Sequence, residues 1–422
     1  MHILNQKKTN HISMNKILFI VFLLFCYNQN AQAETRKPLP EGAIRIVYPN
    51  PNGIYIPAKI NNSVKGYFLF DTGATNLGFD STFFANADLQ ISNWGTARVG
   101  GIGTGGAQIV PLIRDSIDFV FGYHVFRTTN VYISDRKPAH GDCYDGILGN
   151  KYFFENKYVV EISYADEYMV LHNNLSTIDL SGYSKISKKK QDVGISAKFY
   201  VPITIQVNDT LTIEDYFMFD TGAGGAIHIS TTTAEKYNLP ALDTEKFRYA
   251  LSVAGMSGPT TSVLFKVNSV EIGGHKLDDV TLLYSEDQSG TMVSAHAAGG
   301  LLGNRILQNF DMVIDFGDDL ALYLKPNRNF GTPFEDISLY RGFQYADRSQ
   351  TLKGWVVRGF FEGTPAERSG MRSGDKIIFV NGVCVLEIPH EKQFDFWKNL
   401  DKAELVVLRN GEVLRFEFEL NF

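Results

Sequence analysis

One short pattern occurs twice in this chain, and its repetition limits the folds that the chain can adopt. Residues 66–74 read Gly-Tyr-Phe-Leu-Phe-Asp-Thr-Gly-Ala, and residues 215–223 read Asp-Tyr-Phe-Met-Phe-Asp-Thr-Gly-Ala. In each copy an apolar strand ends in a carboxylate and a glycine-containing turn, a setting in which the carboxylate is poorly solvated. Two such sites in matching surroundings predict two related halves that meet and bring Asp71 and Asp220 together.

The duplication extends beyond these short segments. Gly-Ile-Leu-Gly-Asn at 146–150 follows the first copy, and Gly-Leu-Leu-Gly-Asn at 300–304 follows the second. Each half also has one strand-like segment before its Asp-Thr-Gly motif and another after its glycine motif: residues 55–60 and 158–162 in the first half, and residues 200–205 and 312–316 in the second. A self-similarity of roughly 150 residues that keeps strands, turns and glycines in order indicates a duplicated domain rather than a short solenoid repeat.

These motifs resemble those of the aspartic peptidases, in the retropepsin-like and pepsin-like groups. That family has an apolar pair followed by Asp-Thr-Gly or Asp-Ser-Gly, and later an apolar-apolar-Gly motif, in each lobe. Both motifs occur in both halves of this chain, in the same order, across roughly residues 45–325, and the Asp-Thr-Gly-Ala form is closer to the retroviral type. The resemblance implies a mainly β fold of two duplicated lobes.

The resemblance also implies a role for each residue of the repeated motif. Asp71 and Asp220 would form the catalytic pair, the threonines would tie the two loops together, and the glycines would permit tight turns. The supporting residues are Thr72, Gly73, Thr221 and Gly222. Two carboxyls at about 3 Å cannot both ionise readily, so they would share a proton. One carboxyl would then take a proton from water and the other would donate to the peptide carbonyl, without a covalent intermediate.

A glycine-rich segment at 101–106 fits the Gly-x-Gly-x-x-Gly pattern of dinucleotide sites. That pattern requires a following helix, whereas residues 107–113 have the composition of a strand, so we expect no such cofactor. The position suits the flap hairpin that closes over substrate in the family, and Gly-Met-Ser-Gly-Pro at 255–259 occupies the matching place in the second half. The predicted flap residues are Gly101, Ile102, Gly103, Gly105, Gly255, Met256 and Ser257. Neither flap has the Tyr that is usual in pepsins, and the second also lacks the last Gly of a hydrolase elbow, which disfavours a serine nucleophile.

The composition changes from about residue 340. Thr-Pro-Ala-Glu at 364–367 predicts a capped helix start, and Asn-Gly at 410–411 predicts a tight hairpin turn. Residues 364–382 resemble the PDZ domains of bacterial secreted proteases, small α/β modules that bind an extended peptide, often a C-terminus, along a strand beside a helix. The predicted groove residues are Gly354, Trp355, Val356, Val357, Phe394 and Trp397. The alternative is that these aromatic side chains only fill the core of the module.

The N-terminus predicts export. Residues 17–26 are continuously apolar after Lys16, and Ala-Gln-Ala at 31–33 offers small residues for cleavage after Ala33. This is a secretory signal, too short for a membrane span, and it predicts a periplasmic or extracellular protein. The bulky Phe25 before Cys26 disfavours lipoprotein anchoring.

Charge and cysteine content exclude other classes. The formal net charge of −6 disfavours nucleic-acid binding, and the basic run at 185–190 is expected to be a solvated connector between the halves. Cys143 and Cys384 are two lone thiols, which are more typical of apolar residues than of a disulfide. No Cys and His residues have metal-ligand spacing, so we expect no metal.

The sequence therefore predicts four regions. They are a signal peptide at 1–33, aspartic peptidase lobes at 34–184 and 185–335, and a PDZ-like domain at 340–422. The predicted activity is hydrolysis of peptide bonds in a peptide or protein substrate, and the lobes are expected to stay folded without the last domain. One alternative is a noncatalytic peptide-binding or scaffolding protein on the same fold. Another is an enzyme that needs activation because residues 34–50 cover its cleft.

Overall fold

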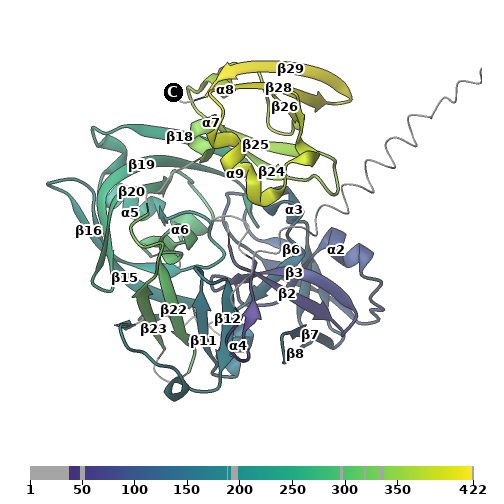
Figure 1. Cartoon of the computed structure of the whole chain (residues 1–422), viewed down its shortest axis with the longest axis vertical. Coiled ribbons are helices and arrows are strands. Elements are labelled where there is room, and N and C mark those ends of the chain that lie inside the picture. The colour runs from purple at the N-terminus through teal and green to yellow at the C-terminus, as the bar shows by residue number, and fades with distance from the viewer. Residues whose placement is uncertain are drawn as a thin grey trace, which may run out of the picture. The chain divides into compact units, whose positions relative to one another are not determined.

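The structure is a computed structural model of the 422-residue chain, and it describes residues 38–47, 53–187, 189–191, 198–294, 298–317, 320–332 and 337–420. The predicted signal peptide, which includes Cys26, lies outside these ranges, as do residues 34–37 and 48–50 of the segment proposed to cover the cleft. Residues Glu41–Phe422 form one compact unit, which is mainly β and contains three sheets among its described residues (Figure 1). No helix within the described ranges is long and apolar enough to cross a membrane.

The first lobe is a nine-stranded sheet with the order β5-β6-β9-β4-β10-β3-β2-β7-β8. Its strands are β2 (Tyr55–Ile60), β3 (Val64–Asp71), β4 (Gly78–Asp80), β5 (Trp94–Val99), β6 (Gln108–Ile113), β7 (Ile117–Phe121), β8 (His124–Thr128), β9 (Val131–Ser134) and β10 (Gly146–Gly149). Its helices are α2 (Ser81–Asn86), α3 (Lys137–His140) and α4 (Lys151–Glu155). Phe68, Leu69 and Phe70 of β3 are all buried, because both faces of this strand are covered, and Phe68 packs edge-on against Phe119 at 4.8 Å.

The second lobe repeats this arrangement. Its strands are β14 (Lys189–Gln191), β15 (Lys198–Gln206), β16 (Thr212–Phe219), β17 (Ile227–Ile229), β18 (Lys246–Gly255), β19 (Gly258–Ile272), β20 (His275–Ser285) and β21 (Gly300–Leu302). Its helices are α5 (Thr231–Lys236) and α6 (Asn304–Leu307), with 3-10 turns η2 (Leu239–Ala241) and η3 (Thr291–Val293). In the first lobe β10 lies parallel to β3 and antiparallel to β4; in the second, β21 lies parallel to β16 and antiparallel to β17. The sequence repeat is therefore a repeat of topology.

A six-stranded sheet joins the lobes, with the order β1-β12-β11-β22-β23-β13. Its strands are β1 (Ile44–Arg45), β11 (Val159–Ser163), β12 (Tyr168–His172), β13 (Ser184–Ser187), β22 (Phe310–Asp315) and β23 (Ala321–Pro326), and η1 (Leu175–Thr177) follows β12. β11 and β22, which the repeat had matched, pair with each other, with Val160 opposite Ile314. The basic run is not simply a solvated connector, because Lys185 lies within β13, opposite Tyr323 of β23.

The C-terminal module has the expected mixture of strands and short helices. Its strands are β24 (Phe343–Asp347), β25 (Trp355–Phe361), β26 (Lys376–Val380), β27 (Val383–Cys384), β28 (Lys402–Arg409) and β29 (Glu412–Glu419). Its helices are α7 (Ile337–Arg341), α8 (Pro365–Arg368) and α9 (Gln393–Lys398), with η5 (Val385–Glu387) and η6 (His390–Lys392). Thr364 caps α8 by accepting the Glu367 N–H at 3.2 Å, and the left-handed Asn410 and Gly411 form the predicted hairpin turn.

The module shares a sheet with the second lobe. β25 pairs antiparallel with β18, so that Leu251 lies opposite Gly359 and Tyr249 opposite Phe361 (Figure 1). A second attachment reaches the first lobe, where the buried Asp142 carboxylate accepts hydrogen bonds from Arg348 and from the backbone of residues 350–351. The module therefore contacts both lobes, and whether the lobes stay folded without it remains a prediction.

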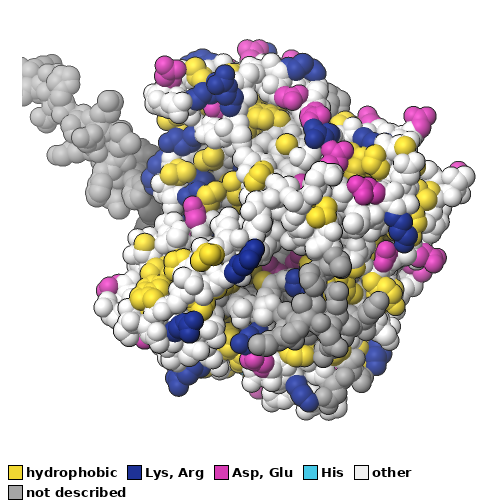
Figure 2. Space-filling view, turned by 180° about the vertical axis from the view of Figure 1, so that it is seen from behind, with side chains coloured by type: hydrophobic (Ala, Val, Ile, Leu, Met, Phe, Trp, Pro, Cys, Tyr) yellow, Lys and Arg dark blue, Asp and Glu magenta, His cyan; other side chains and the backbone are white. Residues whose placement is uncertain are grey.

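On the face of the molecule drawn in Figure 2, lysine and arginine side chains are interspersed with aspartate and glutamate. This face carries no field of a single sign.

Candidate active site

The structure brings the two repeated aspartates together. Asp71 ends β3, Asp220 follows β16, and their carboxyl groups are close enough that each shifts the pKa of the other. A Cβ atom added to Gly73 would lie 2.8 Å from the carboxyl carbon of Asp220, and one added to Gly222 would lie 2.4 Å from that of Asp71. Only glycine fits at these two positions, because a side chain would displace the opposite carboxyl.

The two threonines form a symmetric network between the lobes. Thr72 Oγ1 donates to Phe219 O at 2.8 Å and accepts the Thr221 N–H at 3.1 Å. In the reverse direction, Thr221 Oγ1 donates to Phe70 O at 2.8 Å and accepts the Thr72 N–H at 3.1 Å. Both threonine side chains are fully buried, so all four bonds are shielded from water and fix the two aspartate loops relative to each other.

Two asparagines, to which the sequence analysis gave no role, also donate hydrogen bonds to the backbone of the two aspartate loops. Asn150 Nδ2 donates to Thr72 O at 3.0 Å, and Asn304 Nδ2 donates to Thr221 O at 2.7 Å and to Ala223 O at 2.8 Å. Both asparagines are completely buried. The signal that could have identified them is their identical place after the glycine motif in each half.

Burial controls the proton affinity of the pair. Loss of solvation raises the pKa of Asp71, against hydrogen bonds from Asp220 and from the Ala74 N–H at 2.8 Å. Loss of solvation and the charge of Asp71 raise the pKa of Asp220 well above its ordinary value. Asp220 is also the more buried of the two, at 8% exposure. The pair therefore retains a proton at pH values at which two isolated aspartates would both be ionised.

The predicted flap residues also lie together. The first flap is the β5–β6 hairpin with its tip at 100–107, and the second is the β18–β19 hairpin with its tip at Met256 and Ser257. The two tips are joined by backbone hydrogen bonds from Gly105 N to Ser257 O (2.7 Å), from Ser257 N to Ile102 O (3.0 Å) and from Thr104 N to Pro259 O (2.9 Å). The flaps are therefore closed against each other.

The glycines at the flap tips are required by this contact. Gly103 has φ of +120°, and a Cβ there would lie 2.5 Å from the Ser257 carbonyl carbon. A Cβ on Gly105 would lie 2.7 Å from Ser257 O, and one on Gly255 would lie 2.4 Å from Ile102 O. The first flap is also anchored to the second lobe by Thr291, whose Oγ1 donates to Gly101 O at 2.8 Å.

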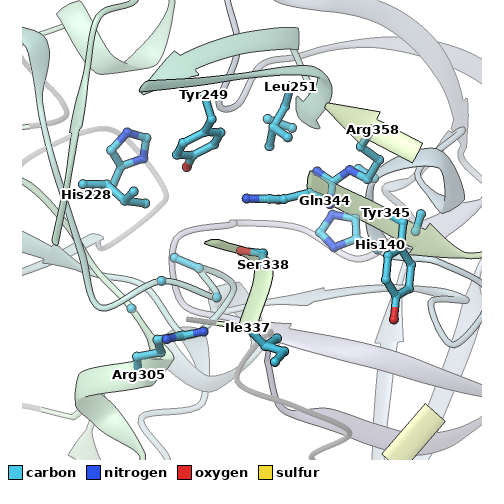
Figure 3. Close-up of a pocket in the computed structure, with 18 of the residues that line it drawn as sticks. His140, His228, Tyr249, Leu251, Arg305, Ile337, Ser338, Gln344, Tyr345 and Arg358 are labelled. Carbon is cyan, nitrogen blue, oxygen red and sulfur yellow. The ribbon is translucent and has the colours of Figure 1, made fainter. Parts of the chain in front are cut away.

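A cavity of about 380 Å³ lies beside the pair, and both lobes and the C-terminal module line it (Figure 3). The first lobe contributes Tyr55, Ile102, Ala139 and His140. The second-lobe aspartate loop contributes residues 222–226, and the flap strand β18 contributes Tyr249, Leu251 and Ala254. The C-terminal module contributes residues 344–347 of β24 and residues around Phe394. The module is therefore a wall of the cavity that adjoins the aspartates.

The predicted groove of the C-terminal module lies elsewhere than the sequence placed it. One edge of β25 is occupied by β24, and the other is occupied by β26 and β18, so residues 354–357 offer no free strand edge. Trp355 and Trp397 are completely buried and Val357 nearly so, which is the core-filling alternative. Trp397 Nε1 donates to Tyr345 Oη at 3.1 Å. β24 lies beside α9, and β25 is the only strand with which it pairs among the described residues. The Asp347 end of its outer edge is not free, because the Asp347 carbonyl accepts the Asp142 N–H of the first lobe at 2.8 Å.

The described residues contain no group of three His, Cys, Asp or Glu placed to hold a metal ion. Cys143 and Cys384 are both partly buried free thiols.

Two family models match the chain. One, described as aspartyl protease, matches residues 203–306, and one for the PDZ domain matches residues 335–408. A solved structure of an aspartic proteinase from Irpex lacteus is similar at 12% sequence identity and a TM-score of 0.43, over 70% of this chain and 99% of that chain. No curated protein matches the chain in sequence. The chain thus contains an aspartyl protease region followed by a PDZ domain, in the order that the sequence predicts.

Proposed function

We propose that this chain is an exported aspartic endopeptidase in which Asp71 and Asp220 activate the water that hydrolyses a peptide bond. The observation that carries the proposal is the proximity of the Asp71 and Asp220 carboxyl groups, whose pKa values are both raised by loss of solvation. The symmetric threonine network supports it, because it maintains this contact from both lobes at once.

The reaction follows from the protonation state of the pair. The ionised carboxyl takes a proton from the attacking water, and the protonated carboxyl donates its proton to the carbonyl oxygen of the substrate. A tetrahedral intermediate then breaks down when the leaving amine is protonated by the pair. No atom of the protein becomes covalently attached to the substrate.

The flaps give the catalytic cycle a conformational step. Their tips are hydrogen-bonded to each other, so they separate to admit a peptide and close over it to exclude water. The presence of one flap on each lobe favours a retropepsin-like mode of closure over the single flap of pepsins.

The PDZ domain is proposed to bind peptides through β24. An extended segment, such as a C-terminal peptide, would add to the outer edge of β24 beside α9, at the residues before Asp347, whose carbonyl is already bonded to the Asp142 N–H. Main-chain hydrogen bonds would give most of the affinity. The apolar segment at 17–26 supports export, and the proposed location is the periplasm or the extracellular space.

The test is cleavage of a mixed peptide library by purified residues 34–422. We expect products from the wild-type chain, and a loss of roughly 10²- to 10⁴-fold in Asp71→Asn, the range of a general acid or base. Asp311→Asn is the control, because this carboxyl accepts a hydrogen bond from Ser163 in the interlobe sheet and takes no part in the pair. Peptide binding without any cleavage by the folded wild-type chain would instead identify a noncatalytic binding protein.

A further inference from the structure

A guanidinium without a carboxylate partner lies in the wall of the cavity. Arg358 of β25 is partly buried, and its Nε and Nη2 donate to Val253 O at 3.2 and 2.7 Å. That carbonyl belongs to the flap strand β18 and carries no net charge. Within the described residues, no Asp or Glu forms an ion pair with Arg358.

A second guanidinium, that of Arg136, lies nearby and also has no carboxylate ion-pair partner among the described residues. Arg136 donates from Nη2 to His140 Nε2 at 2.9 Å, and no carboxylate of the described residues forms an ion pair with its side chain. Burial and the charges of Arg136 and Arg358 hold the pKa of His140 well below its ordinary value, so His140 is neutral and accepts this bond. Burial lowers the pKa of Arg358 to about 10, which leaves it charged at neutral pH. Two positive charges thus adjoin a neutral ring.

The acidic residues that line the cavity do not neutralise these charges. Asp347 accepts hydrogen bonds from Gln393 at 2.6 Å and from the Ser349 N–H at 3.0 Å, and it pairs with His390 at 3.2 Å. Glu391 is exposed. Figure 3 shows Arg358, Gln344 and His140 close together on one side of the cavity.

Partly buried charges in proteins are normally paired, because removing an ion from water without compensation is costly. Arg358 and the neutral His140 line the open cavity, and Arg136 adds a second positive charge through its hydrogen bond to His140 without lining the cavity itself. This arrangement is complementary to an anion. Gln344 adds a neutral donor of the kind that orients a carboxylate. The cavity also contacts the aspartate loop at 222–226, so the anion that fits is one carried by a peptide in the cleft.

We infer that Arg358, supported by Arg136 and His140, forms a subsite for a peptide carboxylate, which makes this enzyme selective for substrates with a carboxylate at that position. The inference rests on the proposed function only in assuming that a peptide occupies the cleft. The carboxylate is either an acidic side chain or the terminal carboxylate of the peptide. The subsite recognises its ligand through side chains, whereas strand addition along β24, whose residues 344–347 also line this cavity, depends on main-chain hydrogen bonds.

The test measures binding and does not require turnover. Fluorescent decapeptides of Ala, Val and Gln bind to the full mature chain carrying Asp71→Asn, and anisotropy gives the Kd. Each peptide has one Glu or a matched Gln scanned along its length, and each exists as a free acid and as a C-terminal amide. We expect the favoured carboxylate to tighten binding at least about tenfold over its neutral match, the range of a charge-assisted hydrogen bond.

Three variants separate recognition from structure. Arg358→Gln should bring the ratio of acidic to neutral affinity close to one, whereas Arg358→Lys should keep part of it because it keeps the charge. Arg348→Gln removes the ion pair between the PDZ domain and Asp142, and Arg348 does not line the cavity, so the ratio should be unchanged.

A preference for an internal Glu identifies an acidic side chain, and a preference for the free acid identifies the peptide terminus; both support the subsite if Arg358→Gln removes them. Equal affinity for acidic and neutral peptides in the wild-type background would overturn the inference. So would an Arg358→Gln chain whose affinity for the neutral peptide falls by the same factor as its affinity for the acidic peptide, since Arg358 would then only clamp β25 to β18. A chain that binds acidic peptides selectively but never cleaves would refute the proposed activity and leave the subsite standing.

Discussion

Replacing Thr72 by Val should loosen both aspartate loops, although only one residue changes. Valine keeps the shape of threonine but removes Oγ1, which donates to Phe219 O and accepts the Thr221 N–H. Both partners are then left unsatisfied in a fully buried site, at about 1–3 kcal/mol each. The loops should therefore open at a local free-energy cost that is lower by about 2–6 kcal/mol.

Hydrogen exchange followed by mass spectrometry measures this opening segment by segment. A loss of 2 kcal/mol accelerates exchange by roughly thirtyfold, and we expect at least this acceleration in residues 215–223 of the Thr72→Val chain. Thr72→Ser keeps Oγ and is the matched control, so exchange in its 215–223 segment should remain close to that of the wild type. Faster exchange confined to residues 66–74 would show that the bonds across the lobes do not hold the second loop.

Three further outcomes follow from the geometry. Asp220→Asn should raise the melting temperature at pH 7 and leave it unchanged near pH 3. The pKa of Asp220 is higher in the folded than in the unfolded chain, so its carboxyl stabilises the fold only while protonated, and this contribution is lost as the pH rises above the pKa of the unfolded chain. A variant that melts at a lower temperature than the wild type at pH 7 would contradict this. Gly105→Ala should reduce peptide turnover far more than thermal stability, because its Cβ would lie 2.7 Å from Ser257 O. Gly100→Ala is the control and should change turnover little, because its Cβ would lie 3.4 Å from the nearest atom. Equal losses of turnover and stability in Gly105→Ala would indicate a purely structural turn. Deleting residues 337–422 should expose the edge of β18 and the apolar side chains beneath it, so the truncated lobes should aggregate or bind a hydrophobic dye; a soluble, fully active truncation would show that the shared sheet is dispensable.

The meeting of the two halves could be predicted because it depends on a repeated pattern. Each Asp-Thr-Gly motif is local in sequence, and a duplicated fold brings equivalent positions to a common axis. The positions of the two flap tips could be predicted for the same reason, since both occupy the same place in the repeat. Asn150 and Asn304 also occupy equivalent positions in the repeat. Their hydrogen bonds to backbone carbonyls could not be predicted, because such bonds do not change composition or periodicity.

The pairing of strand β25 of the PDZ domain with the flap strand β18 could not be predicted. β18 and β25 are separated by about a hundred residues, and pairing between distant strands depends on which edges remain free after each domain has folded. The resemblance to PDZ domains predicts a groove between residues 355–358 and the helix that carries Phe394 and Trp397. In the structure, residues 355–358 belong to β25, an interior strand with neighbours on both edges, so their apolar pattern reflects burial in the core.

The central claim is that the two aspartates act as one unit. The measurement that tests it most directly is kcat/KM for one peptide selected from the library, in the wild type, Asp71→Asn, Asp220→Asn and the double variant. The account predicts that each single variant loses roughly 10²- to 10⁴-fold and that the double variant loses little more, because either change alone disables the shared proton. A single variant with near wild-type turnover, or a double variant whose loss is the product of the two single losses, would contradict it.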